Sequence, residues 1–173
     1  MAAKTSLKPE DLSFPPKILE SGDVTRTFTC GNKDIDEFIQ KEALVFQEEC
    51  LGITYIFKHE SELVGFATLC MDHLSKQKMA SKDRLPKPIP SYPALLIGQL
   101  AVCNNQQTNG IGTFMCDFCF DKAMKLSKIL GCRFLVVNSV ESAVNFYVKY
   151  GFVLAPKQEN EKQKLMFLDI TKR

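Results

Sequence analysis

The feature that most constrains this chain is a glycine-containing turn, Gln107-Thr108-Asn109-Gly110-Ile111-Gly112, between two apolar segments. The segment before it, 95–102, has the composition of a buried strand, and the segment after it, from about 113 to 130, has helical spacing. A strand, a glycine turn and a helix in this order form an anion cradle. Glycine allows a close backbone approach, and the first N–H groups of the helix face the ligand.

The residues around the turn exclude two common phosphate-binding motifs. A P-loop requires Lys-Ser/Thr after its last glycine, whereas Thr113-Phe114 follows Gly112. The dinucleotide fingerprint requires glycine or alanine three residues further on, where this chain has Met115. The turn does match the pattern Q/R-x-x-G-x-G/A. A second pattern, A-x-x-F-Y-x-K-x-G-F, is matched from Ala143 to Phe152.

Together the two motifs resemble those of the GNAT N-acetyltransferase superfamily, and the resemblance extends from about Phe28 to Ile170. It implies a mixed α/β fold, with a mostly antiparallel sheet that is splayed at a central pair of parallel strands and flanked by helices. It also implies acetyl-CoA as the co-substrate and a primary amine as the acetyl acceptor.

The resemblance assigns the cofactor-binding residues. Backbone groups of Leu100, Ala101 and Val102 are expected to pair with the pantetheine amides as an added strand would, although both Leu100 and Val102 also suit a core. The backbone N–H groups expected around the diphosphate belong to Gln107, Thr108, Asn109, Gly110, Ile111, Gly112 and Thr113. A plain helix cap is the alternative role for this turn. The chain departs from the family because residues 104–109 include no Arg or Lys, and neutral donors hold phosphate more weakly.

Two further positions come from the same resemblance. Asn138 matches a residue that hydrogen-bonds the pantetheine arm, with helix capping as the alternative. Tyr147 matches a tyrosine whose hydroxyl protonates or stabilises the departing thiolate, and a buried core tyrosine is the alternative.

No acidic residue lies on 94–102, where many family members have one, so no general base is predicted. No metal site is predicted, since Cys116 and Cys119 have no second Cys/His pair.

One branch of the superfamily is most similar, namely the GNAT toxins of bacterial toxin–antitoxin pairs, which acetylate the α-amino group of aminoacyl-tRNA. The matching segments are 28–31, 52–55, 86–90, 99–102 and the corner around Tyr147, although Gln99 replaces an arginine. An α-amino group has a pKa of about 7.7–8.0, against roughly 10.4 for lysine, so this acceptor hardly needs a strong base. The implied partners are charged tRNA, a small antitoxin and a second copy in a homodimer.

Positive charge gathers in the long connection between two strands, at Lys76, Lys78, Lys82, Arg84 and Lys87. We expect this loop to contact a polyanion, with an ordinary solvated surface as the alternative. The toxin-like function also has alternatives. One is a free-standing N-acetyltransferase acting on a small amine or a protein amine, and another is a degenerate domain that binds coenzyme A without turnover. A third alternative is a nucleic-acid-binding module, against which the small net charge of +2 argues.

Length and composition predict the remaining organisation. The 173 residues predict a single domain, 1–173, in which about 1–17 are loosely ordered. No apolar stretch is long enough to span a membrane, and the N-terminus has no signal-like pattern. The seven cysteines lack a disulfide-framework spacing, which indicates reduced thiols. These features predict a cytoplasmic protein without a membrane partner.

The local patterns predict the order of helices and strands. A helix capped by Asn32 or Asp34 is expected to reach about Cys50. A short helix capped by Asn138 or Ser139 is expected to end before Gly151, and Gly131 to cap the long helix. The expected strands are 53–57 and 63–71 as a hairpin, 94–102, 133–137, and 152–155 with 165–170 around the polar hairpin 157–164.

Overall fold

The structure of the chain is a computed structural model that describes residues 6–23, 25–156 and 162–173. The chain separates into two compact units. Unit 1 consists of Met1–Cys70 and Gly98–Asp117, and unit 2 consists of Met71–Ile97 and Phe118–Arg173. The strands β3 and β4 and the helix α3 each contribute residues to both units.

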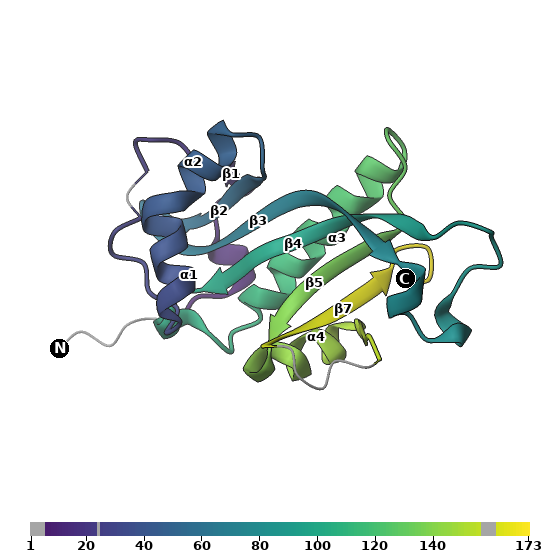
Figure 1. Cartoon of the computed structure of the whole chain (residues 1–173). Helices are drawn as coiled ribbons and strands as arrows, with labels where there is room; N and C mark the ends of the chain where they lie inside the picture. Colours follow the sequence, from purple (N-terminus) through teal and green to yellow (C-terminus); the bar gives the residue numbers. More distant parts are fainter. Residues whose placement is uncertain (1–5, 24, 157–161) are drawn as a thin grey trace. The chain divides into compact units, whose positions relative to one another are not determined.

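The helices and strands follow the predicted mixed α/β order (Figure 1). In chain order they are η1 (Pro9–Asp11), β1 (Lys17–Ile18), α1 (Lys33–Glu37), the π-helical η2 (Phe38–Glu42), α2 (Ala43–Glu48), β2 (Ile53–His59), β3 (Glu62–Ser75), η3 (Lys76–Lys78), η4 (Ser81–Asp83), β4 (Ser91–Val102), η5 (Asn104–Gln106), α3 (Ile111–Ser127), β5 (Phe134–Val140), η6 (Glu141–Ala143), α4 (Val144–Tyr150), β6 (Val153–Leu154) and β7 (Gln163–Asp169).

One sheet joins the strands in the order β1-β2-β3-β4-β5-β7-β6. The pairs β1–β2, β2–β3, β5–β7 and β6–β7 are antiparallel, whereas β4 and β5 are parallel. The parallel register runs from Ala94↔Phe134 to Ile97↔Val137. Beyond it β4 continues to Val102 and β5 to Val140. This topology confirms the predicted mostly antiparallel sheet with a parallel central pair.

Unit 1 is built around the β2–β3 hairpin, whose register runs from Ile53↔Leu69 to His59↔Glu62. Asn32 begins α1, because its side-chain oxygen accepts hydrogen bonds from the backbone N–H groups of Asp34 and Ile35. The helical segment α1-η2-α2 packs its apolar side chains on the hairpin, in a core of Leu19, Phe28, Phe38, Ile39, Ala43, Ile56, Phe66 and Ala101. The predicted capping role of Asn32 is therefore confirmed.

The N-terminal segment of unit 1 differs from the expected loose packing where the structure describes it. Leu7 and Leu12 are buried. The backbone N–H of Ser13 donates to the carbonyl of Lys58 at 2.7 Å, and β1 pairs with β2. Apolar burial and backbone pairing both hold this segment, and neither was visible in its polar, Pro-bearing sequence. Residues 1–5 lie outside the described part of the chain.

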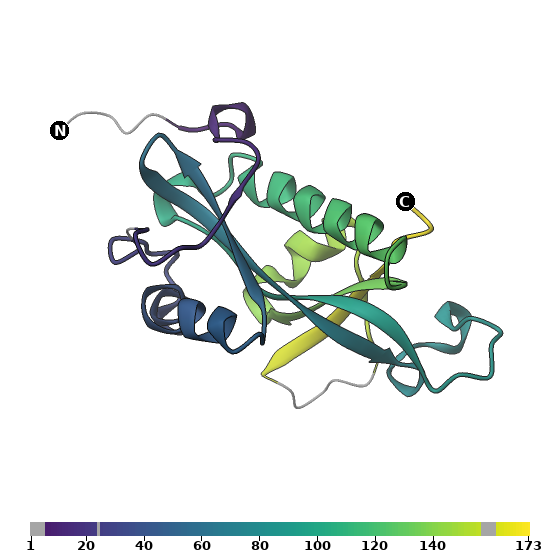
Figure 2. The same cartoon turned by 90° about the horizontal axis from the view of Figure 1, so that it is seen from above.

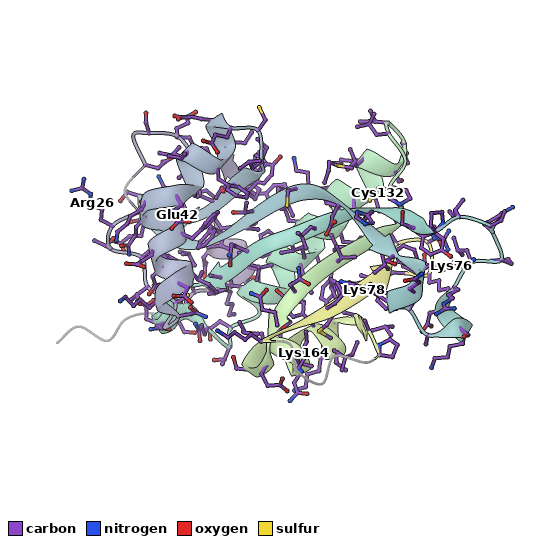
Figure 3. All side chains as sticks on the ribbon, in the orientation of Figure 1. Arg26, Glu42, Lys76, Lys78, Cys132 and Lys164 are labelled. Carbon is purple, nitrogen blue, oxygen red and sulfur yellow. The ribbon has the colours of Figure 1, made fainter. Side chains whose placement is uncertain are left out.

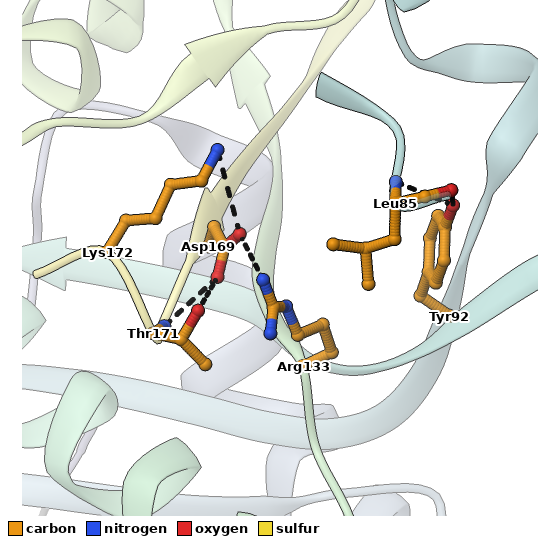
Figure 4. Close-up of polar contacts among 6 residues, drawn as sticks. All are labelled: Leu85, Tyr92, Arg133, Asp169, Thr171 and Lys172. Atoms are coloured by element: carbon orange, nitrogen blue, oxygen red, sulfur yellow. Dashed lines mark hydrogen bonds and ion pairs between the residues drawn. The ribbon is translucent and has the colours of Figure 1, made fainter. Parts of the chain in front are cut away.

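Unit 2 has its own aromatic core. The ring of Phe134 lies 5.4 Å from that of Tyr92 and 5.9 Å from that of Phe167. The long connection between β3 and β4 is folded onto this core. Met79 is buried in it, and the Tyr92 hydroxyl accepts from the N–H of Leu85 at 3.1 Å and donates to the carbonyl of Leu85 at 3.3 Å (Figure 4).

Several predicted helix boundaries are wrong. Figure 2 shows α3 as one continuous helix. It begins at Ile111 and ends at Ser127, so Leu130 lies beyond it and is 71% exposed. Neither Asn138 nor Ser139 caps a helix, because β5 pairs with β7 through both residues. Pairing with a distant strand prevails here over local capping preference. The predicted hairpin 157–164 falls mostly on residues 157–161, which lie outside the described residues.

Candidate active site

The predicted diphosphate loop of unit 1 is an irregular turn that leads into α3. Two of its residues have left-handed backbone conformations, Thr108 with φ +71° and Gly110 with φ +83°. The first helical bond runs from the N–H of Phe114 to the carbonyl of Gly110 at 3.1 Å. The N–H groups of the opening turn have no carbonyl in their own helix to donate to, which is the property that suits a helix start to a phosphate.

A side chain could be added at Gly110 without a clash inside the protein. A Cβ atom built there meets only Cγ of Pro9, at 3.8 Å. The positive φ, however, is a conformation that side-chain-bearing residues rarely adopt. Gly110 therefore serves the turn through its conformation, and the space beside it is open to a ligand.

The side chain of Gln107 faces the protein's own backbone. Its Nε2 donates to the carbonyl of Cys30 at 3.0 Å, to the carbonyl of Val102 at 3.0 Å and to Oδ1 of Asn104 at 3.3 Å. The Gln107 side chain is thus occupied within unit 1. Any contribution of this residue to diphosphate binding comes from its backbone N–H, as the resemblance implies.

The predicted pantetheine-binding segment forms the end of β4. Ala101 is buried in the core of unit 1, while Leu100 and Val102 are half-buried. The backbone here is closely approached, since a Cβ atom on Gly65 would lie 2.9 Å from the carbonyl of Ala101. The carbonyl oxygen of Val102 already accepts one hydrogen bond from Gln107, so only its second lone pair remains for an amide of pantetheine.

The two other predicted residues belong to unit 2. Tyr147 lies on α4 with 5% exposure, and its ring contacts Phe146 at 5.0 Å and Phe152 at 5.3 Å between centroids. These edge contacts fix the direction of the ring. Asn138 is exposed on β5 and pairs in register with Leu165 of β7. The structure thus brings Leu100 to Val102 and the loop 107–113 together in unit 1, and places Asn138 and Tyr147 in unit 2.

A carboxylate that the sequence did not single out organises the segment before α1. Asp36 accepts from the Thr29 hydroxyl and from the N–H of Cys30, both at 2.8 Å. Burial raises the pKa of Asp36, but these hydrogen bonds lower it, and the net pKa lies below its usual value. Burial and the neighbouring Asp36 raise the pKa of Cys30 to about 11. The Cys30 thiol is therefore protonated at neutral pH and is unsuited to act as a nucleophile.

A cavity of about 260 Å³ lies in unit 2, lined by Asp83, Phe134, Tyr150, Gly151, Val153, Phe167, Leu168, Asp169, Lys172 and Arg173. None of the predicted cofactor or catalytic residues is among them.

Asp169, which lines this cavity, accepts from Nη2 of Arg133 at 2.7 Å and from the Thr171 hydroxyl at 2.8 Å (Figure 4). Burial raises the pKa of Asp169, while its bonds with Thr171 and Arg133 bring the net pKa below its usual value. This cluster joins β5 to the end of β7 and has a structural role.

Within the described residues, no group of three or more His, Cys, Asp or Glu side chains is placed to hold a metal ion. Across residues 6–23, 25–156 and 162–173, no helix has the length and apolar character needed to cross a membrane.

Residues 51–154 match the family model of the acetyltransferase (GNAT) domain, which covers more than half of the chain. The chain belongs to this family. It is an N-acetyltransferase whose acetyl donor is acetyl-CoA, as the two motifs predicted.

Among known proteins, the chain is similar to the tRNA-acetylating toxin of Mycobacterium tuberculosis. The two are 25% identical over 145 residues, which are 83% of this chain and 86% of the toxin. Among solved structures, it is similar in fold to AtaT complexed with acetyl-methionyl-tRNAfMet, with a TM-score of 0.81, 22% identity and coverage of 93% and 96%. It is also similar to an AtaT variant bound to acetyl-CoA and the C-terminus of the antitoxin AtaR, with a TM-score of 0.75, 19% identity and coverage of 94% and 95%.

Proposed function

We propose that this enzyme transfers the acetyl group of acetyl-CoA to the α-amino group of aminoacyl-tRNA and thereby blocks the use of that tRNA in translation. The similarity to a tRNA-acetylating toxin over most of both chains supports this acceptor. The observation that carries the proposal is the basic loop of unit 2, residues 76–87, which is folded and rich in lysine. A tRNA acceptor presents a phosphate backbone that such cations can bind.

The basic loop holds its cations on an ordered backbone. Nζ of Lys76 donates to the carbonyl of Lys87 at 2.6 Å, and Nε of Arg84 donates to the carbonyl of Met79 at 3.0 Å. Lys76 and Lys78 are labelled in Figure 3. The side chains left exposed are those of Lys78, Lys82, Arg84 and Lys87. A backbone fixed in advance loses less conformational entropy when its cations bind phosphates.

The chemistry of the proposed reaction needs few side chains. The neutral amine attacks the acetyl carbonyl carbon, the bond from that carbon to sulfur breaks, and the amine loses a proton to solvent. The departing thiolate takes a proton from the Tyr147 hydroxyl, which is then reprotonated by solvent. In this proposal Asn138 and the backbone of Leu100 to Val102 bind the pantetheine arm. The backbone of Gln107 to Thr113 binds the diphosphate.

The proposal extends to partners and location. AtaT is a toxin whose structure contains the C-terminus of its antitoxin AtaR. We accordingly propose a small antitoxin as a protein partner of this chain, a homodimer as its own assembly, and the cytoplasm, where charged tRNA is found, as its location. The single-domain organisation stays part of the same proposal.

The test is acetyl transfer from labelled acetyl-CoA to a panel of charged tRNAs, polyamines and peptides. The expected result is labelled aminoacyl-tRNA, with a KM that rises with salt. Replacing Lys78 and Lys82 by alanine should raise the KM for charged tRNA. Replacing two other exposed lysines, Lys125 of α3 and Lys128 just after its end, is the charge-matched control and should raise it less. Label only on polyamines or peptides, indifferent to salt and to the loop lysines, would contradict the tRNA proposal.

A free-standing enzyme that acetylates a small amine is the second candidate. The small net charge of +2 favours it over a strongly polyanionic substrate. The same panel separates the two candidates, because a small-amine enzyme has no reason to respond to the loop lysines.

A further inference from the structure

The N-terminal segment of unit 1 is bound to the loop that precedes α3. The backbone N–H of Leu7 donates to Oε1 of Gln106 at 2.8 Å. Leu7 is 8% exposed and Gln106 7% exposed, so this hydrogen bond is shielded from water. The same Oε1 lies 3.5 Å from Nδ2 of Asn109, inside the predicted diphosphate loop. Pro9, two residues beyond Leu7, is the residue that a Cβ at Gly110 would meet.

The neighbouring amide ties the other side of the loop to the segment before α1. Gln107 bonds the carbonyls of Cys30 and Val102, and the N–H of Asn104 donates to the carbonyl of Thr29 at 2.9 Å. Two adjacent glutamine side chains therefore connect the loop to three other parts of unit 1, namely the N-terminal segment, Cys30 and the end of β4.

The loop backbone requires such support. Thr108 is β-branched and has φ +71°, a conformation that is rare for residues of this kind and that persists only where the surroundings impose it. The loop also lacks cations, so its affinity for a diphosphate depends on N–H groups that are already aimed at the ligand.

We infer that Gln106 and Gln107 are positioning residues, whose side-chain amides hold the backbone of the diphosphate loop in its binding conformation and compensate for its missing positive charge. The inference rests on the proposal that the backbone of 107–113 binds the diphosphate. Neither amide contacts the cofactor in this account. Both act through the N–H groups of the loop.

The test compares three glutamine-to-methionine changes, which keep size and neutrality but remove the amide. Gln106→Met and Gln107→Met remove the two supports. Gln47→Met is the matched control in the same unit, because Gln47 also makes two hydrogen bonds, to the carbonyl of Leu19 at 3.1 Å and from the N–H of Thr54 at 3.2 Å. Acetyl-CoA affinity is measured by calorimetry and Tm by thermal unfolding. KM is compared between acetyl-CoA and S-acetylpantetheine, which has no diphosphate.

Each support variant should raise the Kd for acetyl-CoA about tenfold, as expected for the loss of one well-placed hydrogen-bonding group. The KM for S-acetylpantetheine should stay unchanged in Gln106→Met. In Gln107→Met it should rise less than the Kd for acetyl-CoA, because Gln107 also bonds the carbonyl of Val102 in the segment that binds pantetheine. Gln47→Met should lower Tm as much as Gln106→Met and Gln107→Met do, but it should leave the Kd for acetyl-CoA unchanged. Asn104→Ala, at an exposed position, removes one acceptor of Gln107 and should raise the Kd by a smaller factor, which keeps the test available if a methionine variant does not fold.

Gly110→Val separates this inference from the loop assignment. If Gly110→Val weakens acetyl-CoA binding while Gln106→Met, Gln107→Met and Asn104→Ala bind like the wild type, the positioning role is wrong and the loop assignment stands. If Gly110→Val itself binds acetyl-CoA normally, the loop does not hold the diphosphate, and the positioning role is lost with it.

Discussion

Replacing Tyr92 by phenylalanine should release the basic loop while leaving the core of unit 2 filled. The ring would remain against Phe134, but the N–H and carbonyl of the half-buried Leu85 would both lose their partner. A typical net value of roughly 0.5–1.5 kcal/mol for each hydrogen bond sets the loss of stability at about 1–3 kcal/mol. In a protein of this size 1 kcal/mol changes Tm by about 2–4 °C, so Tm should fall by about 2–12 °C.

Three measurements follow from this change. Thermal unfolding gives Tm, hydrogen exchange reports whether the amide of Leu85 opens faster, and kinetics give the KM for charged tRNA, which should rise while acetyl-CoA affinity stays the same. Tyr150→Phe, which removes a hydroxyl elsewhere in unit 2, is the control and should leave the exchange of Leu85 unchanged. Wild-type values of Tm, exchange and KM in Tyr92→Phe would refute the reasoning that this hydroxyl orders the loop.

Three other changes have defined outcomes. Gly110→Val should raise the Kd for acetyl-CoA at least about tenfold in a folded protein, since β-branched residues rarely adopt a φ near +83° and the loop would have to impose this conformation at a second position besides Thr108; calorimetry checks this. Tyr147→Phe should lower kcat by about 10²- to 10⁴-fold with unchanged acetyl-CoA affinity, and wild-type turnover would reduce Tyr147 to a packing residue. The folded pKa values of Asp36 and Asp169 lie below the usual value of about 3.9, so their stabilisation is present above that pH and is lost as pH falls below it. Tm measured at decreasing pH should show this fall, with a shallower slope in Asp169→Asn.

The glycine loop and the β2–β3 hairpin were predictable because each is determined by residues that lie close together in the sequence. A helix that begins at the glycine turn follows from the turn sequence, although α3 begins at Ile111, two residues before the predicted start at about 113. The buried stripe of α3, including Met115 and Cys119, follows from helical spacing. The β2–β3 hairpin follows from two β-branched runs around a polar turn. Each of these depends on residues within a few positions of one another.

The supports of the loop were not predictable because they depend on long-range contacts. Leu7 and Gln106 are 99 residues apart in the chain, and Gln107 and Cys30 are 77 apart. A glutamine carries no local pattern that indicates which distant carbonyl or N–H it will bond. Asn138 is a similar case. Its local sequence suggests a helix cap, but pairing with the distant strand β7 makes it part of β5.

The most direct test of the proposed function is the identity of the acetylated product. Purified enzyme is incubated with labelled acetyl-CoA and a charged tRNA, the ester bond is hydrolysed with mild base, and the released amino acid is analysed by mass spectrometry. We predict an N-acetyl amino acid in the presence of the wild-type enzyme, and much less with Tyr147→Phe. Release of only the free amino acid, from an enzyme that acetylates a small amine in the same assay, would contradict the assignment of aminoacyl-tRNA as the acceptor.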